Sequence, residues 1–279
     1  MAGSSIDHLT PRSLAEGAAA IVATADLAAK IALAKLTAEA WRDNRLSLSR
    51  RTGMPMPDRP GRPPRPVLLP PRRMPKRSTE GEKGRFALMH ALAHIELNAV
   101  DMTWDLIGRF HAESVPAAFF DDWVRVGYEE AAHFEMVTQR LGELGGSYGD
   151  LPAHDGLWQA AQATGHSLIA RVAVVPLILE ARGLDVSPAL IASLTAAGDK
   201  ASAAVIEVIY RDEKTHVACG SRWFRFLCER EGRPLEATFH RLVRENFRGP
   251  VKPPFNDAAR SEAGLTPGFY KPLARLIGD

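Results

Sequence analysis

The feature that most constrains this chain is a pair of Glu-x-x-His patterns, each preceded by a lone glutamate. The six residues are Glu96, Glu130 and His133, followed by Glu180, Glu213 and His216. The lone glutamate stands 34 residues before the first pattern and 33 residues before the second. Residues three apart on a helix point to nearly the same side, so a glutamate and a histidine can reach one cation. A four-helix bundle supplies the ligands of a dinuclear metal centre in this way.

Four long apolar patterns with helical periodicity carry these residues. They cover residues 84–111, 117–144, 165–183 and 199–231. Asp199 is a predicted N-cap of the last pattern, and Gly232 is its predicted stop. Nothing in this span alternates convincingly as a strand. The sequence therefore predicts an all-α fold.

The connection between the second and third helices must span the length of the bundle. A continuous helix from Gly156 would place Glu180 about 36 Å along its axis. The ten residues 146–155 could hardly cover that distance at about 3.4 Å per residue. We therefore predict a separate short helix over 155–164 and a third helix that opens at Gly165 and ends near Gly183. Another short helix after Pro188 would lead to the fourth.

Outer segments flank the bundle. Residues 13–43 have the periodicity of helix, with Asp26 as the cap of a second piece after a short break. The stretch 53–75 is too rich in proline for a helix or a central strand, and we expect an extended arm over the bundle. The last thirty residues predict loop and short helix on the surface. The predicted segments are 1–82 for the N-terminal helices and arm, 83–232 for the bundle, and 233–279 for a C-terminal extension.

Composition narrows the class of protein. The hydrophobic fraction of 46% is ordinary for a globular protein. The net charge of +2 is too small to imply that the whole chain binds nucleic acid. The two cysteines, Cys219 and Cys228, predict buried thiols in a reducing compartment. The sequence shows no stretch of about 20 apolar residues and no apolar core of a signal peptide. We therefore expect a cytoplasmic protein without a membrane span.

The neighbours of the six residues indicate the kind of chemistry. Positions beside the ligands on the same helix faces, such as Leu92, Val100, Val126, Ile209 and Gly220, carry no further Asp, Glu or His, which disfavours an iron-storage route. Gly127 and Gly183 are predicted to leave room for oxygen or substrate. Tyr210, three residues before Glu213, has two open interpretations: a group bonded to a ligand or active in redox chemistry, or a plain core tyrosine.

Other polar residues near the patterns are not predicted to be ligands. Glu129 and Asp212 directly precede a glutamate of the set and point about 100° away from it, as surface groups or groups that support the ligands would. His90 and His94 share one face of the first long helix. We interpret both histidines as capping groups or as groups that support the ligands.

Several runs of sequence resemble a bacterial ferritin-like family catalogued as a domain of unknown function. They are HALAHIELNAVD (90–101), YEEAAHF (128–134), YGDLPAHDGLW (148–158), EARGLD (180–185), DEKTHVACGSRWF (212–224) and KPPFN (252–256). More distantly, the arrangement is similar to rubrerythrins and to the bacterial tRNA hydroxylase that modifies a thiomethylated isopentenyl adenosine. The resemblance implies a ferritin-like four-helix bundle and puts the six residues in the ligand positions.

Three functions fit these observations. The leading hypothesis is a di-iron oxidase or oxygenase that uses O2 on a small-molecule substrate, with two iron ions or, as an alternative, manganese. The second is a metal-binding or iron-handling protein without an organic substrate. The third is a tRNA-modifying enzyme that binds phosphates through residues 50–77, which hold nine Lys and Arg against one acid, Asp58. A homodimer is the expected assembly.

Overall fold

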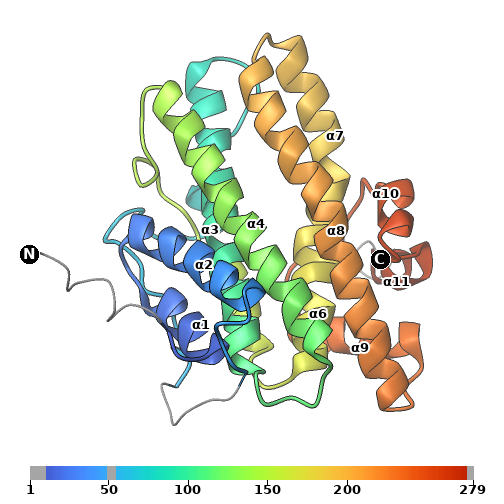
Figure 1. The fold of residues 1–279 in the computed structure, drawn as a ribbon. Helices are drawn as coiled ribbons and strands as arrows, with labels where there is room; N and C mark the ends of the chain where they lie inside the picture. The colour runs from blue at the N-terminus through green and yellow to red at the C-terminus, as the bar shows by residue number, and fades with distance from the viewer. Residues whose placement is uncertain (1–10, 49–54, 275–279) are drawn as a thin grey trace, which may run out of the picture. The chain divides into compact units, whose positions relative to one another are not determined.

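The computed structural model describes residues 11–48 and 55–274, and over these residues the chain is helical without a single β-strand (Figure 1). The elements are α1 (Leu14–Ala23), α2 (Leu27–Arg42), η1 (Pro71–Arg73), α3 (Glu82–Arg109), α4 (Ala117–Glu143), α5 (Gly156–Ala163), α6 (Leu168–Val174), η2 (Val175–Glu180), α7 (Ala181–Ala196), α8 (Lys200–Arg230), α9 (Leu235–Asn246), α10 (Asp257–Glu262) and α11 (Pro267–Ala274). The predicted all-α class is confirmed, and the packed helices agree with a ferritin-like bundle.

Contacts along the chain define two compact units. The first comprises residues 1–65 and 96–135, and the second comprises residues 66–95 and 136–279. The helices α3 and α4 are therefore each divided between the two units. The three segments 1–82, 83–232 and 233–279 stay a prediction.

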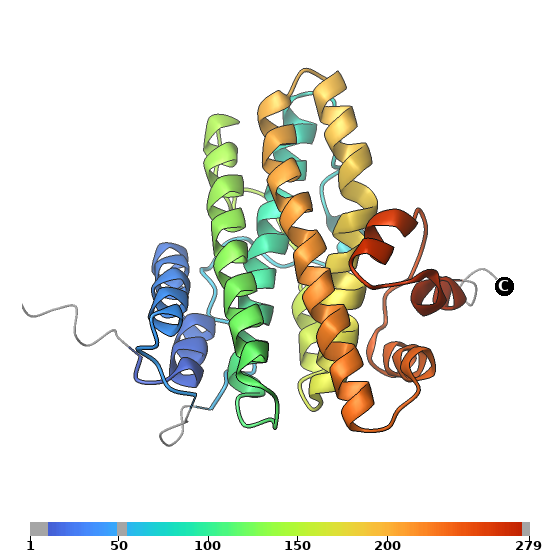
Figure 2. The same ribbon diagram turned by 45° about the vertical axis from the view of Figure 1, so that its right-hand side comes forward.

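In the first unit, α1 and α2 pack against each other (Figure 2). The Ser13 hydroxyl accepts a hydrogen bond from the Glu16 N–H at 3.3 Å, and the Asp26 carboxylate accepts one from Ala29 at 2.8 Å. These are the side-chain caps that begin a helix. The predicted helical segment with a break before a capping Asp26 is confirmed.

A buried ion pair holds the proline-rich arm to the first unit. Lys30 Nζ lies 2.5 Å from one Asp101 carboxylate oxygen, and Arg62 of the arm lies 2.7 Å from the other. Lys30 also donates to the Gly61 carbonyl at 3.1 Å. A Cβ at Gly61 would lie 2.1 Å from the Ala23 carbonyl oxygen, so the close approach of the arm requires glycine.

The arm is otherwise extended, as predicted, with one unpredicted 3-10 turn at η1. In the second unit the Leu69 N–H donates to the Ala153 carbonyl at 2.8 Å, and the Ala153 N–H donates to the Val67 carbonyl at 3.0 Å. The arm is thus fastened to the crossover by two backbone hydrogen bonds. The predictions for residues 49–54 lie outside the described part of the chain.

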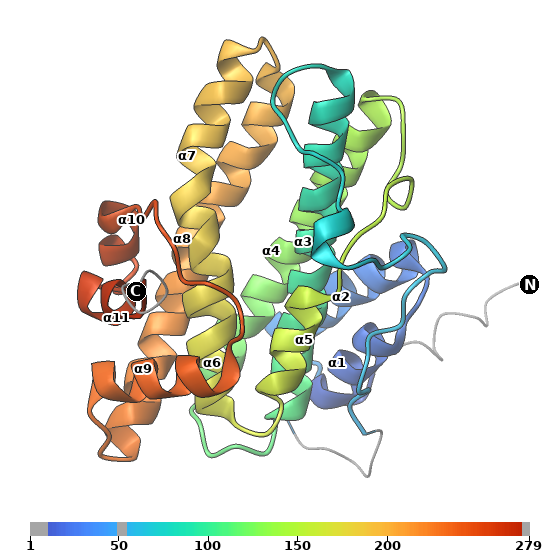
Figure 3. The same cartoon turned by 180° about the vertical axis from the view of Figure 1, so that it is seen from behind.

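The crossover contains a separate short helix, α5, as the length argument requires (Figure 3). The third long helix then begins at Leu168, slightly after the predicted Gly165, with the Ser167 hydroxyl accepting from the Ala170 N–H at 3.4 Å. The buried Arg171 donates to the Thr164 hydroxyl at 2.8 Å and so ties α6 to the end of α5.

The predicted end of the third helix near Gly183 is wrong, as is the separate helix after Pro188. The helical path continues from α6 through the π-helix η2 and α7 to Ala196. Proline lacks an N–H, so Pro188 leaves the Leu184 carbonyl without its helical donor. Asn256 Nδ2 donates to that carbonyl at 3.1 Å. At Pro176 the chain widens into η2 instead of ending.

The second unit is built around α8, which runs beside α7 (Figures 1 and 3). Asp199 caps α8 and Gly232 follows its end with a φ of 63°, so both predicted boundaries are confirmed. The C-terminal helices cover this unit, since α9 contacts α6 and α10 contacts α8. Both cysteines are buried, and burial raises the pKa of Cys228 to about 11, so the prediction of buried thiols is confirmed.

Replacement of Asp199 by alanine tests the cap of α8. Its carboxylate accepts from the Ser202 N–H at 3.0 Å and from Arg140 at 2.9 Å. We expect Asp199→Ala to lower the free energy of unfolding by about 1–2 kcal/mol, measured by urea unfolding. Asp155→Ala is the matched control, because Asp155 precedes α5 without a side-chain capping bond, and it should cost clearly less.

The stabilisation by Asp199 is also expected to depend on pH. Burial alone would raise the pKa of Asp199, but hydrogen bonds from Ser202 and the charges of Arg140 and Arg85 hold it below 3.8. A carboxyl group with a lowered pKa stabilises the fold above its unfolded value, and the effect disappears as the pH falls through the lowered value. The stability gap between wild type and Asp199→Ala should therefore be constant down to about pH 4 and narrow below it. A gap that is unchanged well below this pH contradicts the assignment.

Replacement of Asn256 tests how the helix passes Pro188. Asn256→Ala removes the donor to the Leu184 carbonyl, the donor to the Tyr210 hydroxyl at 3.2 Å and the N-cap of α10. We expect a loss of about 2 kcal/mol in the free energy of unfolding. Tyr210→Phe, which removes a single one of these bonds, should cost less. Equal effects of the two variants would show that the carbonyl contact contributes nothing.

Candidate metal centre

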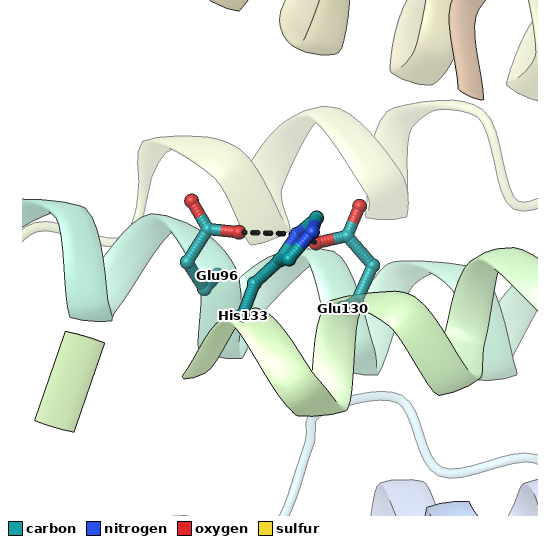
Figure 4. Close-up of side chains that lie close together, drawn as sticks. All are labelled: Glu96, Glu130 and His133. Carbon is teal, nitrogen blue, oxygen red and sulfur yellow. Dashed lines mark ion pairs between the residues drawn. The ribbon is translucent and has the colours of Figure 1, made fainter. Parts of the chain in front are cut away.

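Three of the predicted residues form a buried cluster in the first unit (Figure 4). Glu96 comes from α3, and Glu130 and His133 come from α4. His133 Nδ1 lies 3.4 Å from a Glu96 carboxylate oxygen and 3.5 Å from a Glu130 carboxylate oxygen. The exposed fractions are 2% for Glu96, 0% for Glu130 and 1% for His133. The three residues offer ligand atoms within 4.8 Å of one another, a spacing that could hold a metal ion.

The periodicity of α4 explains how two polar residues reach the core. Val126, Glu130, His133, Val137 and Leu141 follow one another at steps of three or four residues, and all are buried. Such positions form one face of a helix. Glu130 and His133 therefore occupy places that aliphatic residues fill one turn before and one turn after them.

Burial and mutual charge set the electrostatics of this cluster. Burial raises the pKa of Glu96 to about 7, and the nearby Glu130 adds to the rise, although contact with His133 offsets part of it. Burial lowers the pKa of His133, but bonds to Glu130 and Glu96 outweigh it and raise the value to about 11. The two carboxylates thus create a buried place that favours positive charge. Carboxylate oxygens with an imidazole nitrogen are a donor set that suits iron, manganese or zinc, so the residues fit a divalent metal ion.

The second set of predicted residues lies in the second unit. Glu213 and His216 are on the buried face of α8, with His216 Nδ1 at 3.7 Å from a Glu213 carboxylate oxygen. Glu180, 7% exposed, is the last residue of the π-helix η2. Within the described residues Glu180 belongs to no cluster of three or more potential ligands at metal-binding spacing. Short π-helices are rare in proteins overall, and those that occur are often found at functional sites.

The two glycines predicted to leave space behave differently. A Cβ at Gly127 would lie 2.9 Å from Trp104 Nε1, so the buried indole fills this position and the prediction is wrong there. A Cβ at Gly183 would contact Glu213 at 3.7 Å from its Cγ, an ordinary van der Waals distance. The described chain therefore leaves room beside Glu213 at Gly183 and leaves none at Gly127.

The polar residues next to the ligand positions have partners elsewhere. Glu129 forms an ion pair with Arg125 at 3.2 Å, and Asp212 forms one with Arg211 at 3.0 Å. Both glutamate and aspartate are partly exposed, in keeping with the surface interpretation. The Tyr210 hydroxyl is within hydrogen-bonding distance of Asn256, which connects α8 with the C-terminal segment.

His90 and His94 hold the crossover loop to α3. His90 Nε2 accepts from the Gly149 N–H at 2.9 Å and from the Leu151 N–H at 3.3 Å. His94 lies 2.7 Å from the Tyr148 hydroxyl and 2.9 Å from the carbonyl oxygen of residue 154. The capping interpretation agrees with these contacts. Sequence reasoning assigned no role to Tyr148, although the run YGDLPAHDGLW that contains it was among the distinctive ones.

Over residues 11–48 and 55–274, no helix combines the length and the apolar character that crossing a bilayer requires. The absence of a membrane span among these residues agrees with the prediction. A cytoplasmic location, a homodimer and nucleic-acid binding through residues 50–77 stay predictions.

Comparison with known proteins adds the family. The model of a family described as "Protein of unknown function (DUF455)" matches residues 23–271. An uncharacterized protein of Haemophilus influenzae is 40% identical to this chain over 209 residues, which make up 73% of each chain. No solved structure matches, and similarity to rubrerythrins or to the tRNA hydroxylase stays an expectation. The match over nearly the whole chain shows that this protein belongs to the DUF455 family.

Proposed function

We propose that this protein is a dinuclear metal carboxylate enzyme, an oxidase or oxygenase that uses O2 on a small organic substrate. The observation that carries the proposal is the buried cluster of Glu96, Glu130 and His133. Burying two ionised carboxylates costs several kcal/mol of desolvation free energy per ion unless a cation compensates for the lost hydration. A divalent ion gives this compensation and also uses the imidazole as a ligand.

The second set of residues extends the proposal from one ion to two. Glu180, Glu213 and His216 repeat the residue types and the order of the first set. Four carboxylates and two imidazoles balance the charge of two divalent ions, as in ferritin-like di-iron proteins. We therefore propose that the six residues together hold two iron ions, with manganese as the alternative.

The metal ions and the protein chain would contribute different parts of the reaction. When bound, a pair of iron ions supplies the electron transfer and the O2 chemistry that amino-acid side chains lack. The chain holds the ligands in place and keeps water away with apolar neighbours such as Leu177 and Val217, both 0% exposed. The absence of a side chain at Gly183, where an added Cβ would lie 3.7 Å from Glu213 Cγ, supports a place for a small reactant beside the second set.

The alternative of an iron-handling protein draws on the same ligands. Iron storage and transfer need further acidic groups along a route for the ions, whereas most positions beside the ligands on α3, α4 and α8 carry apolar residues or glycine. This apolar surrounding favours chemistry on an organic substrate. The two functions differ in what happens after oxygen is added.

Metal stoichiometry tests the ligand set. We expect the wild-type protein to bind two equivalents of Fe(II) under anaerobic conditions, measured by metal analysis after gel filtration. Glu130→Gln and Glu213→Gln should each lose two-metal binding, because the amide keeps the size of the side chain but removes a charged ligand.

The matched controls lie directly beside these residues. Glu129→Gln and Asp212→Asn remove one negative charge at the preceding position, where the native side chain pairs with an arginine. Both controls should keep two equivalents of iron. Two equivalents in Glu130→Gln or in Glu213→Gln would show that the proposed ligand set is wrong.

Oxygen uptake separates an enzyme from an iron-handling protein. Air-saturated buffer is added to the Fe(II)-loaded protein, and O2 consumption and ferric product are recorded. For the proposed enzyme, uptake stops with the bound iron and resumes on addition of reductant and a small-metabolite extract, because turnover needs an organic substrate. Continued uptake in proportion to added Fe(II) alone, with a ferric product, would instead support iron handling.

A further inference from the structure

A hollow in the second unit, lined by none of the proposed metal ligands, has a volume of about 140 Å³. It is bounded by the arm at Met74, Pro75 and Arg77, by α3, and by the crossover from Leu151 to Leu157. This volume has room for about ten water molecules, and hence for a molecule of about ten non-hydrogen atoms. It is smaller than the roughly 300–1,000 Å³ of sites for drug-sized ligands, so it suits a small molecule.

The walls of the hollow are mostly apolar. Ala87, Ala91 and Ile95 of α3 line one side, and Leu151 and the aliphatic residues of the crossover line the other. Ile95 is 42% exposed, although its neighbours Ala93, His94, Glu96 and Leu97 on the helix are buried. An exposed apolar surface in a concave place is typical of ligand binding.

Two residues with nitrogen donors, Arg77 and His154, also line the hollow. His154 Nδ1 accepts from the Gly156 N–H at 3.2 Å, so in the neutral ring the proton is on Nε2, which is a donor. Burial and the positive charge of Arg77 lower the pKa of His154, which keeps the ring neutral. In the described part of the chain Arg77 forms no ion pair with a carboxylate. One guanidinium with a neutral donor beside it therefore matches a ligand with a single negative charge.

The loop that lines the hollow is built by buried groups. His90 and His94 are 1% and 6% exposed, line the hollow, and bond to the backbone of the crossover. A wall held by buried hydrogen bonds is preorganised, which lowers the cost of binding.

None of the residues that line the hollow is a proposed metal ligand. Successive residues of a helix are rotated by about 100°, so Glu96 is about 200° around the helix from His94. Ala87, Ala91 and His94 share the face toward the hollow. A ligand in the hollow is therefore separate from the metal ligands.

From these observations we infer that the hollow between the arm, α3 and the crossover binds a small organic monocarboxylate, with its apolar body against Ala91 and its carboxylate at Arg77. A carboxylate matches the planar fork of an arginine through two parallel hydrogen bonds. A phosphate monoester, with nearly two charges, would leave one charge unbalanced at this single cation.

Calorimetric titration of the full-length protein tests this site with benzoate and hexanoate as probes. Benzamide, which has the shape of benzoate without the charge, is the neutral comparison. We expect saturable binding of a carboxylate with a Kd on the order of 1 mM or below, since a ligand of this size gains limited affinity. Benzamide should bind at least about tenfold more weakly, because it loses a charge-assisted contact.

Three variants connect this binding to the hollow. Arg77→Gln should weaken carboxylate binding at least about tenfold. Lys76→Gln, the neighbouring cation of the arm that does not line the hollow, should keep wild-type affinity. Ala91→Phe should abolish binding by filling the space, and its unfolding transition shows whether the variant is folded. Arg77→Gln changes an exposed residue and decides the question even if Ala91→Phe does not fold.

The inference is overturned if neither carboxylate shows saturable binding, if benzamide binds as well as benzoate, or if Arg77→Gln keeps the wild-type affinity. The iron content of Arg77→Gln should stay at the wild-type value. Failure of the metal centre with intact benzoate binding, or the reverse, therefore distinguishes the two proposals.

Discussion

The removal of charged side chains from water is the constraint on which the rest of this structure depends. Asp101 and Asp185 are buried, and each lies within ion-pair distance of arginine, with a lysine also beside Asp101. Glu96 and Glu130 are buried as deeply but lie against the imidazole of His133. A buried pair of carboxylates stabilises no fold by itself, since desolvation exceeds the gain unless a cation is present. The structural acids Asp101 and Asp185 thus face arginine and lysine, whereas the cation beside Glu96 and Glu130 is a histidine, whose ring can release its proton and bind a metal.

The helix α3 brings these demands together, because buried polar groups occur along most of its length. Near its first turns His90 and His94 bind the crossover, and further along Asp101 receives the arm. Glu96 stands between them on the face opposite His94. Most of the proline-rich arm, and the crossover before α5, lack regular hydrogen bonding of their own. Polar side chains of α3 supply part of their partners, which gives these buried groups a structural role.

Local signals in the sequence predicted much of this arrangement, and contacts between distant residues account for the errors. The cap at Asp199 and the positions of Glu130 on α4 follow from spacing along one helix, which needs no tertiary information. Pro188 breaks the same local rules, and its helix continues because Asn256, far along the chain, serves the Leu184 carbonyl. Space at Gly127 was likewise misjudged, since an indole from another helix fills it. A glycine in the sequence shows that a position has no side chain, but it does not show which distant residue fills the space.

The same distinction explains why ligand chemistry is easier to predict than substrate. A ligand set is fixed by residue types at helical spacing, whereas a binding wall is assembled from elements that meet only in the fold. The hollow beside α3 is formed jointly by the arm, the crossover and the helix, and no sequence motif predicts it. Two sites on one helix influence each other when a ligand binds two states of that helix with different affinity. A second position of α3 is one way to give such coupling, and the fully buried side chains of Ala93, Leu97 and Val100 oppose a shift of the helix.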